Sequence, residues 1–290
     1  MHDWLDELRL EPGPPYAVMG TRALDPSSWL LFDGDDVREA QLARKAQLIA
    51  DHRGIVFGAL PGSEEASAEV LELVEAALAA RGLAPRDPIG DHPLIDAAAS
   101  IQEDLVVLQR VDGSWVLTAG VVCFPTHWTV TNKLGLTLAS IHQPVAHYAE
   151  ELQQRVDRFH DRLTVDRPVW RRNWFVLATD ELFLPDREDV AEAQQTVQSI
   201  DPDGSPLWIR SERQTLRRLA RSDAIVFTIR VQQAPLGVLL DRPELAAKML
   251  AATRSWDSRK RAYTSTGGVL DELIDWLAGV ADGTSPRRPS

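Results

Sequence analysis

The sequence predicts a mixed α/β protein in which helices pack on an antiparallel sheet. Two hairpin patterns predict the sheet: one turns at Asp112-Gly113, and the other joins 207–219 to 224–231. Segments with apolar residues every three or four positions predict the helices. A doubly wound parallel fold is disfavoured, because no glycine-rich phosphate loop follows any predicted strand.

The predicted elements follow one another in a regular order along the chain. A proline-containing lead-in comes first, and Gly54 and Gly82 lie just beyond the first two predicted helices. The elements expected, in chain order, are helices at 37–52, 64–80 and 94–102, strands at 105–109 and 115–124, a helix at 145–163, a strand at 173–178, the second hairpin, and helices at 243–251 and 266–280. We expect a single domain over residues 1–282 and a disordered, polar tail at 283–290.

Composition narrows the possible classes of function. A formal net charge of -12 argues against binding nucleic acid through bulk electrostatics. The only cysteine, Cys123, permits neither an intramolecular disulfide nor a cysteine-based zinc or iron–sulfur site. The N-terminus lacks a signal-peptide pattern, and no apolar run approaches the roughly 20 residues that span a bilayer. We therefore expect a cytoplasmic protein with no nucleic-acid and no membrane partner.

Histidine spacing argues against a mononuclear zinc site. His142 and His147 are five residues apart with Pro144 between them, so they cannot chelate a metal from one helix face. His142 lies just before a predicted helix, in a segment restrained by Pro144. A single imidazole in such a setting is either an axial haem ligand or a buried histidine that bonds to backbone.

Several charged residues have two possible interpretations. Asp104 immediately precedes a buried strand, where an acid is either a cap or a functional carboxylate. Arg210 and Glu212 share one face of a predicted strand, and Arg213 follows them. Buried charges there need partners, and the planar guanidinium group fits carboxylates well; a solvated sheet face is the alternative. Arg172 opens another predicted strand, where surface charge is again the alternative.

Taken together and in order, several segments resemble the haem-dependent oxidative N-demethylase family. The resemblance covers roughly residues 15 to 240 and rests on Met19-Gly20 with Trp29, Gln102-Glu103-Asp104-Leu105, Phe124-Pro125 with Trp128, Lys133-Leu134-Gly135, Ile141-His142-Gln143-Pro144-Val145, Arg171-Arg172-Asn173-Trp174, Arg210 to Leu219, and Ile225 to Ile229. Two positions depart from the family's pattern, because Ala146 and Ala220 stand where the family has proline.

The resemblance implies a PAS-like fold that holds haem b. It also implies oxidative demethylation of a small secondary amine such as dimethylamine, with O2 as a reactant and formaldehyde released. The electrons would come from a separate flavin and iron–sulfur reductase or a ferredoxin, because this chain has neither a cysteine cluster nor a flavin signature.

The same resemblance suggests roles for individual residues. His142 is expected to be the iron ligand, with Arg172 and Lys133 binding the cofactor. Asp104 is expected to hold the cationic amine, and Arg210 and Arg213 to line the distal pocket or bind the propionates. Two alternatives remain open: a haem-binding PAS-type sensor or carrier, and a cofactor-free interaction protein that kept the fold.

Overall fold

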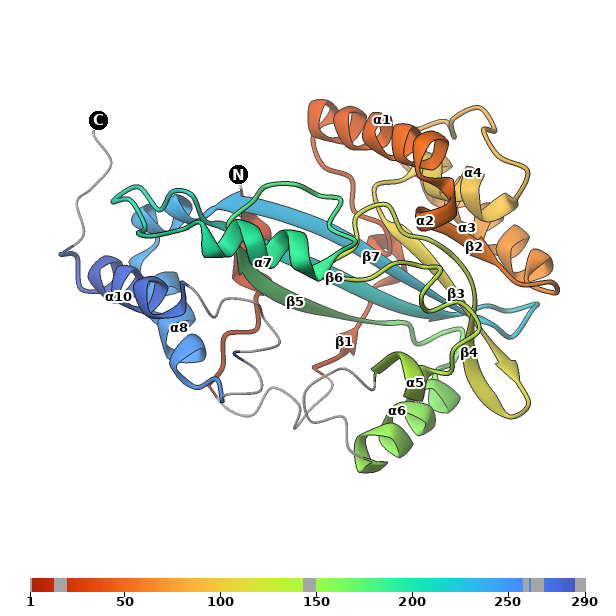
Figure 1. Cartoon of the computed structure of the whole chain (residues 1–290). Helices are drawn as coiled ribbons and strands as arrows, with labels where there is room; N and C mark the ends of the chain where they lie inside the picture. The colour runs from red at the N-terminus through yellow and green to blue at the C-terminus, as the bar shows by residue number, and fades with distance from the viewer. Residues whose placement is uncertain (1, 13–19, 143–149, 258–260, 262–268, 285–290) are drawn as a thin grey trace.

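A seven-stranded sheet organises the computed structural model, which describes residues 2–12, 20–142, 150–257, 261 and 269–284 (Figure 1). The strand order is β1-β5-β6-β7-β3-β4-β2, and all six neighbouring pairs are antiparallel. The strands are β1 (Arg22–Ala23), β2 (Phe57–Ala59), β3 (Asp104–Val111), β4 (Ser114–Val121), β5 (Val169–Leu177), β6 (Trp208–Arg218) and β7 (Ile225–Pro235). The predicted mixed α/β class with an antiparallel sheet is therefore confirmed.

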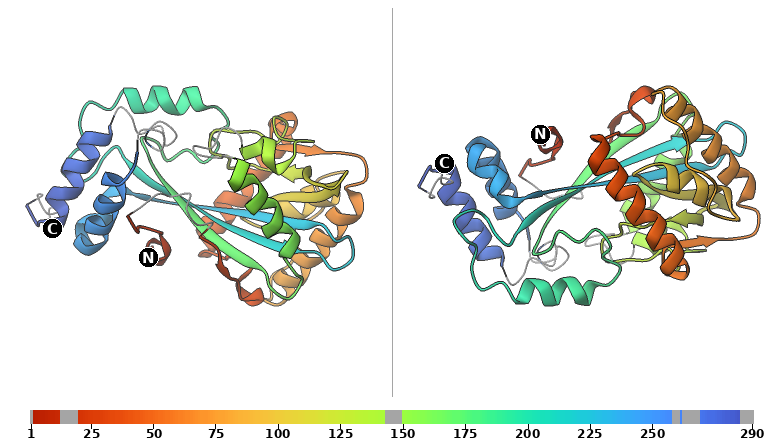
Figure 2. Two further views of the ribbon diagram at one scale, coloured as in Figure 1. Left: turned by 90° about the horizontal axis from the view of Figure 1, so that it is seen from below. Right: turned by 90° about the horizontal axis from the view of Figure 1, so that it is seen from above.

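Helices cover both faces of this sheet. The α-helices of the described residues are α1 (Asp35–Asp51), α2 (Arg53–Val56), α3 (Glu64–Ala79), α4 (Pro93–Ser100), α5 (Leu138–His142), α6 (Glu150–Arg162), α7 (Arg187–Gln195), α8 (Pro243–Arg254) and α10 (Leu270–Ala281). Figure 2 shows α1 and α6 on opposite sides of the sheet. In the part of the chain that the structure describes, no helix has the length and apolar character needed to cross a membrane.

The two predicted hairpins form through residues that tolerate positive φ. Asp112 and Gly113 have φ values of 50° and 81°, so both central residues of the first turn adopt the left-handed conformation. In the second hairpin Asp223 has φ 56°, and the Leu219 N–H donates to the Ala224 carbonyl to close the turn. These turns bring β3 onto β4 and β6 onto β7.

Strand alternation divides the apolar core between the two faces. On one face Leu105 and Val107 pack with side chains of α3 and α4. On the other face Val106 and Leu108 pack with Leu138 of α5 and with α6. Successive side chains of a strand point to opposite faces, so one valine-rich strand serves both layers. A further cluster joins α8 and α10 to the N-terminal 3-10 helix η1 (Asp3–Glu7) at the other end of the sheet.

Some elements differ from the sequence-based expectation. Residues 187–195 form α7 and residues 138–142 form α5, although no helix was expected in either stretch. The lead-in, for which no element was expected, contains η1 and the short edge strand β1. The first residues of the helix expected at 145–163 lie outside the described residues, as does the expected tail from residue 285 onward.

Candidate functional site

Arg210 anchors the segment that follows β4. Its guanidinium group is fully buried and donates to the carbonyl oxygens of Phe124 (2.9 Å), Pro125 (3.1 Å), Leu182 (3.1 Å) and Glu181 (3.2 Å). Its Nε also donates to the Thr126 hydroxyl at 3.0 Å. Burial lowers the pKa of Arg210 to about 10, so the side chain stays cationic at neutral pH. Arg210 therefore joins the segment after β4 to the one that precedes α7.

Asp104 also holds the segment that follows β4. Its two carboxylate oxygens accept the N–H groups of Cys123 (3.0 Å) and Phe124 (2.8 Å). The Lys45 ammonium of α1 lies 3.6 Å from Asp104 Oδ1, and neither side chain is exposed. Burial raises the pKa of Asp104, while Lys45 and the two N–H groups oppose that shift. The Asp104 carboxylate thus already has a cation and two amide donors, and its expected role in amine binding stays a prediction.

A chain of side-chain hydrogen bonds crosses one face of β5 and β6. The Thr126 hydroxyl donates to Glu212 Oε1 at 2.6 Å, and Gln214 Nε2 donates to Glu212 Oε2 at 2.9 Å. Arg171 Nε then donates to Gln214 Oε1 at 2.7 Å. Since residues two apart on a strand share a face, this arrangement confirms that Arg210, Glu212 and Gln214 lie on one side of β6.

Lys133 belongs to the same side of the sheet. It lies in the loop just before α5, with Nζ 4.1 Å from the centre of the Trp128 ring. Burial lowers the pKa of Lys133 to about 8, and the Glu212 carboxylate acts against this shift. The structure therefore brings Lys133 and Arg210 together around Glu212.

Arg172 and Arg213 lie on the opposite face of the sheet. They stand directly across from each other on β5 and β6. Arg172 donates through Nε (3.1 Å) and Nη2 (2.6 Å) to Glu7, while Arg213 donates to the carbonyls of Trp29 (3.1 Å) and Ser28 (2.7 Å). Both arginines therefore fasten N-terminal residues onto the sheet, and their expected contacts with a cofactor stay predictions.

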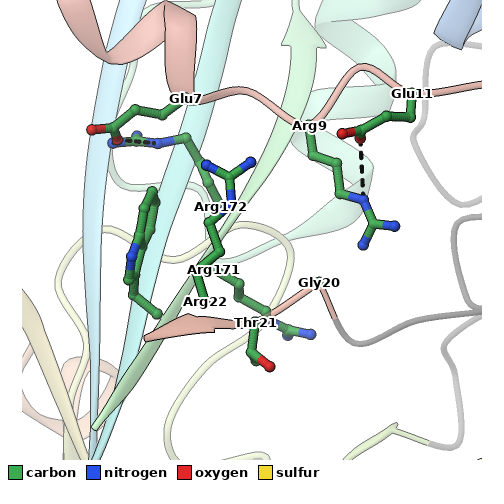
Figure 3. A pocket seen from close by; sticks show the side chains of 9 residues that line it. Glu7, Arg9, Glu11, Gly20, Thr21, Arg22, Arg171 and Arg172 are labelled. Atoms are coloured by element: carbon green, nitrogen blue, oxygen red, sulfur yellow. Dashed lines mark hydrogen bonds and ion pairs between the residues drawn. The ribbon is translucent and has the colours of Figure 1, made fainter. Parts of the chain in front are cut away.

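A basic cavity of about 200 Å³ opens at the edge of β5 (Figure 3). Its lining consists of Glu7, Arg9, Glu11, Gly20, Thr21, Arg22, Trp170, Arg171 and Arg172. Arg9 pairs with Glu11, and Arg172 pairs with Glu7. The cavity still holds more cations than carboxylates, so it suits an anionic group. Arg171 connects this cavity to the hydrogen-bond chain on β6.

His142 ends α5 on the side of the sheet that carries Glu212. Leu138 is buried, and Ile141 is partly buried; both belong to the apolar cluster that contains Leu216, which shares its face of β6 with Glu212. The backbone of His142 belongs to the described residues, whereas its side chain lies outside them. In the part of the chain that the structure describes, no three His, Cys, Asp or Glu side chains converge on a metal-ion site.

His127 is a candidate that sequence reasoning did not single out. It lies on the segment held by Arg210, has φ 64°, and its buried Nε2 finds no hydrogen-bond partner among the described residues. Burial, with the nearby Arg187 and Arg210, lowers the pKa of His127 to about 4, so the imidazole is neutral at pH 7. The left-handed φ of His127 marks it as unusual, and the sequence alone does not reveal a backbone angle.

The chain was compared with known protein families. Residues 83–274 match the family described as haem-dependent oxidative N-demethylase, alpha subunit-like. The chain belongs to this family. The match confirms the resemblance found in the sequence and extends past residue 240, although Met19-Gly20 and Trp29 lie outside the matched range. Membership of the haem-dependent oxidative N-demethylase alpha subunit-like family associates the chain with haem and with oxidative N-demethylation. The antiparallel sheet is compatible with the PAS-like fold that the resemblance implied.

The groups on the α5 side of the sheet fit a haem. A haem needs an apolar surface for its ring, a ligand for its iron and cations for its propionates. Apolar side chains of α5 and β6 supply the surface, and the chain's direction places His142 beside them. Lys133 is a half-buried cation whose ammonium makes no hydrogen bond or ion pair among the described residues, and Arg171 adds a guanidinium group at the cavity. Buried cations of this kind suit carboxylates.

Proposed function

We propose that this chain binds haem b on the α5 side of its sheet and oxidatively demethylates a small secondary amine such as dimethylamine. O2 is the oxidant, formaldehyde is released, and a separate reductase or ferredoxin supplies the electrons. The observation that carries the proposal is the gathering of Lys133, Arg171 and Glu212 beside the apolar cluster that precedes His142. Family membership supports the same cofactor and class of reaction.

The residues are proposed to divide the work as follows. His142 binds the iron, while Lys133 and Arg171 bind the propionates. When bound, the haem supplies the O2-dependent oxidation of an N-methyl group. Asp104 and Arg210 act as positioning residues, since between them they bond Cys123, Phe124, Pro125 and Thr126 just before Trp128 and Lys133.

Burial of these positioning groups also serves to keep water out. Phe124 is 1% exposed and Val130 is fully buried, so both ends of the segment pack into the core, while residues 126–129 between them are half-buried. Charge interactions beside the buried ends of the segment are strengthened, because water screens them less there.

Formaldehyde release tests the proposed activity. We expect haem-loaded protein, supplied with a competent reductase and its electron donor, to produce formaldehyde in proportion to the dimethylamine consumed. Omitting the amine, the reductase or O2 should each abolish the product. A protein that carries haem but releases no formaldehyde with any small secondary amine would instead be a sensor or carrier.

A further inference from the structure

Glu212 has an unusual position among the charges of the sheet. The three neighbouring strands β5, β6 and β7 contain seven arginines and a single carboxylate, which is Glu212. The chain as a whole is acidic, with a net charge of -12, so this arginine-rich core is a local reversal. Glu212 therefore either stabilises the fold through its hydrogen bonds or binds a cationic ligand.

Hydrogen bonds fix the Glu212 carboxylate without neutralising it. Its two bonds come from neutral donors, the Thr126 hydroxyl and the Gln214 amide. A carboxylate offers about four acceptor positions, so roughly half of its capacity stays open. The side chain is only 7% exposed, and no cation lies within ion-pair distance of it among the described residues.

The other carboxylates near the core are placed differently. Asp104 faces Lys45, Glu7 faces Arg172 and Asp33 faces Arg230, each within ion-pair distance. Glu103 accepts the Leu31 N–H at 2.8 Å, and its pKa is raised by burial on the opposite side of the sheet, beneath Leu31. Glu212 is thus a buried carboxylate on the α5 side that has no cation within ion-pair distance among the described residues.

We propose that Glu212 binds the cationic nitrogen of the amine substrate. This inference rests on the proposed function and names the residue that recognises the substrate class. A secondary amine is protonated at neutral pH, and its N–H groups can donate to the open positions of the carboxylate. Such charge-assisted hydrogen bonds are stronger than neutral ones. Thr126 and Gln214 orient the carboxylate so that the bound ammonium lies on the α5 side of β6.

Lys133 sets the electrostatic context of this site. Its ammonium lies over the Trp128 ring, and it is a cation of the same charge as the substrate. The cation–π contact holds the Lys133 ammonium on the indole ring, and it forms no ion pair with Glu212 among the described residues, so the open acceptor positions of the carboxylate are not taken by Lys133.

Calorimetric titration with dimethylammonium chloride tests the inference directly. The haem-loaded protein is compared with Glu212→Gln, which keeps the shape and removes the charge, and with Glu188→Gln, which removes an exposed carboxylate of α7. We expect Glu212→Gln to weaken dimethylammonium binding at least about tenfold, because a charged hydrogen bond is lost. Glu188→Gln should bind the ion as the parent protein does.

A second variant guards against misfolding. Glu212→Asp keeps the charge on a shorter side chain and is expected to show intermediate affinity, and thermal unfolding of each variant confirms that it folds. Equal affinity in the parent protein and in folded Glu212→Gln would overturn the inference while leaving the proposed function intact. No measurable dimethylammonium binding by the parent protein would overturn it too. A protein that takes up no haem would contradict the proposed function, and this outcome is distinguishable from a loss of dimethylammonium binding.

Discussion

The buried Asp104–Lys45 pair provides a sharp test of how the candidate site is held. Replacing Asp104 with Asn keeps the shape but leaves the Lys45 ammonium buried without a counter-charge. Removing one member of a buried pair costs about 3–5 kcal/mol of unfolding free energy. Lys45 retains its hydrogen bond to the Ile101 carbonyl at 3.0 Å, so we expect the lower half of that range. Lys45→Met should be destabilising as well, because it leaves Asp104 buried with only its two amide donors.

Urea unfolding followed by the fluorescence of the nine tryptophans measures each step. The double variant Asp104→Asn/Lys45→Met removes both charges together, so its loss should be smaller than the sum of the two single losses by about 1–3 kcal/mol. An exposed pair gives the control: Arg221 and Glu72 are both about half exposed, and a matched cycle there should give a coupling below about 1 kcal/mol. The reasoning is refuted if Asp104→Asn costs less than about 1 kcal/mol, or if the buried cycle is additive.

Three further changes test other parts of the structure. Lys133→Met should stabilise the fold by up to about 3 kcal/mol at pH 7, because the pKa of Lys133 is about 8 in the folded state and lies below its unfolded value. This gain in unfolding free energy should vanish above about pH 10.5, where Lys133 is neutral in both states. Urea titrations at the two pH values measure the difference. Burial lowers the pKa of His160 to about 4, so about 3 kcal/mol of unfolding free energy should be lost as the pH falls from 6.5 to 4. In His160→Gln the midpoint of urea unfolding should depend less on pH over this range. Gly204→Ala should lower Tm more than Gly62→Ala, since both glycines have φ 91° but only at Gly204 does a Cβ meet backbone, 2.6 Å from Gly237 N; equal losses would contradict this.

Local patterns in the sequence predicted most of the architecture. The helices at 35–51 and 64–79 and both hairpins follow from apolar spacing and from turn residues such as Asp112 and Gly113. β1 and α5 were missed because they are only two and five residues long, too short for a periodic signal. α7 was missed because its charged residues gave no continuous apolar stripe.

Long-range pairing explains what the sequence could not show about the site. Alternation along β6 correctly placed Arg210 and Glu212 on one face, and the same rule places Arg213 on the other. The partner of Asp104 is Lys45, which is far away in the sequence, and the link appears only once α1 packs against β3. Glu212 was visible as a polar residue on the predicted strand, but its neutral donors Thr126 and Gln214 became apparent only in three dimensions.

Haem content tests the central claim most directly. We would express the parent protein, His142→Ala and the exposed-histidine control His52→Ala with a haem precursor. The visible spectrum of each would be recorded oxidised and dithionite-reduced, with and without dimethylamine. We expect about one haem b per chain in the parent protein and in His52→Ala, a Soret band that shifts with the amine, and a lost or altered band in His142→Ala. No Soret band in the parent protein, even after titration with haemin, would contradict the account; an unchanged band in His142→Ala would contradict the assignment of the iron ligand.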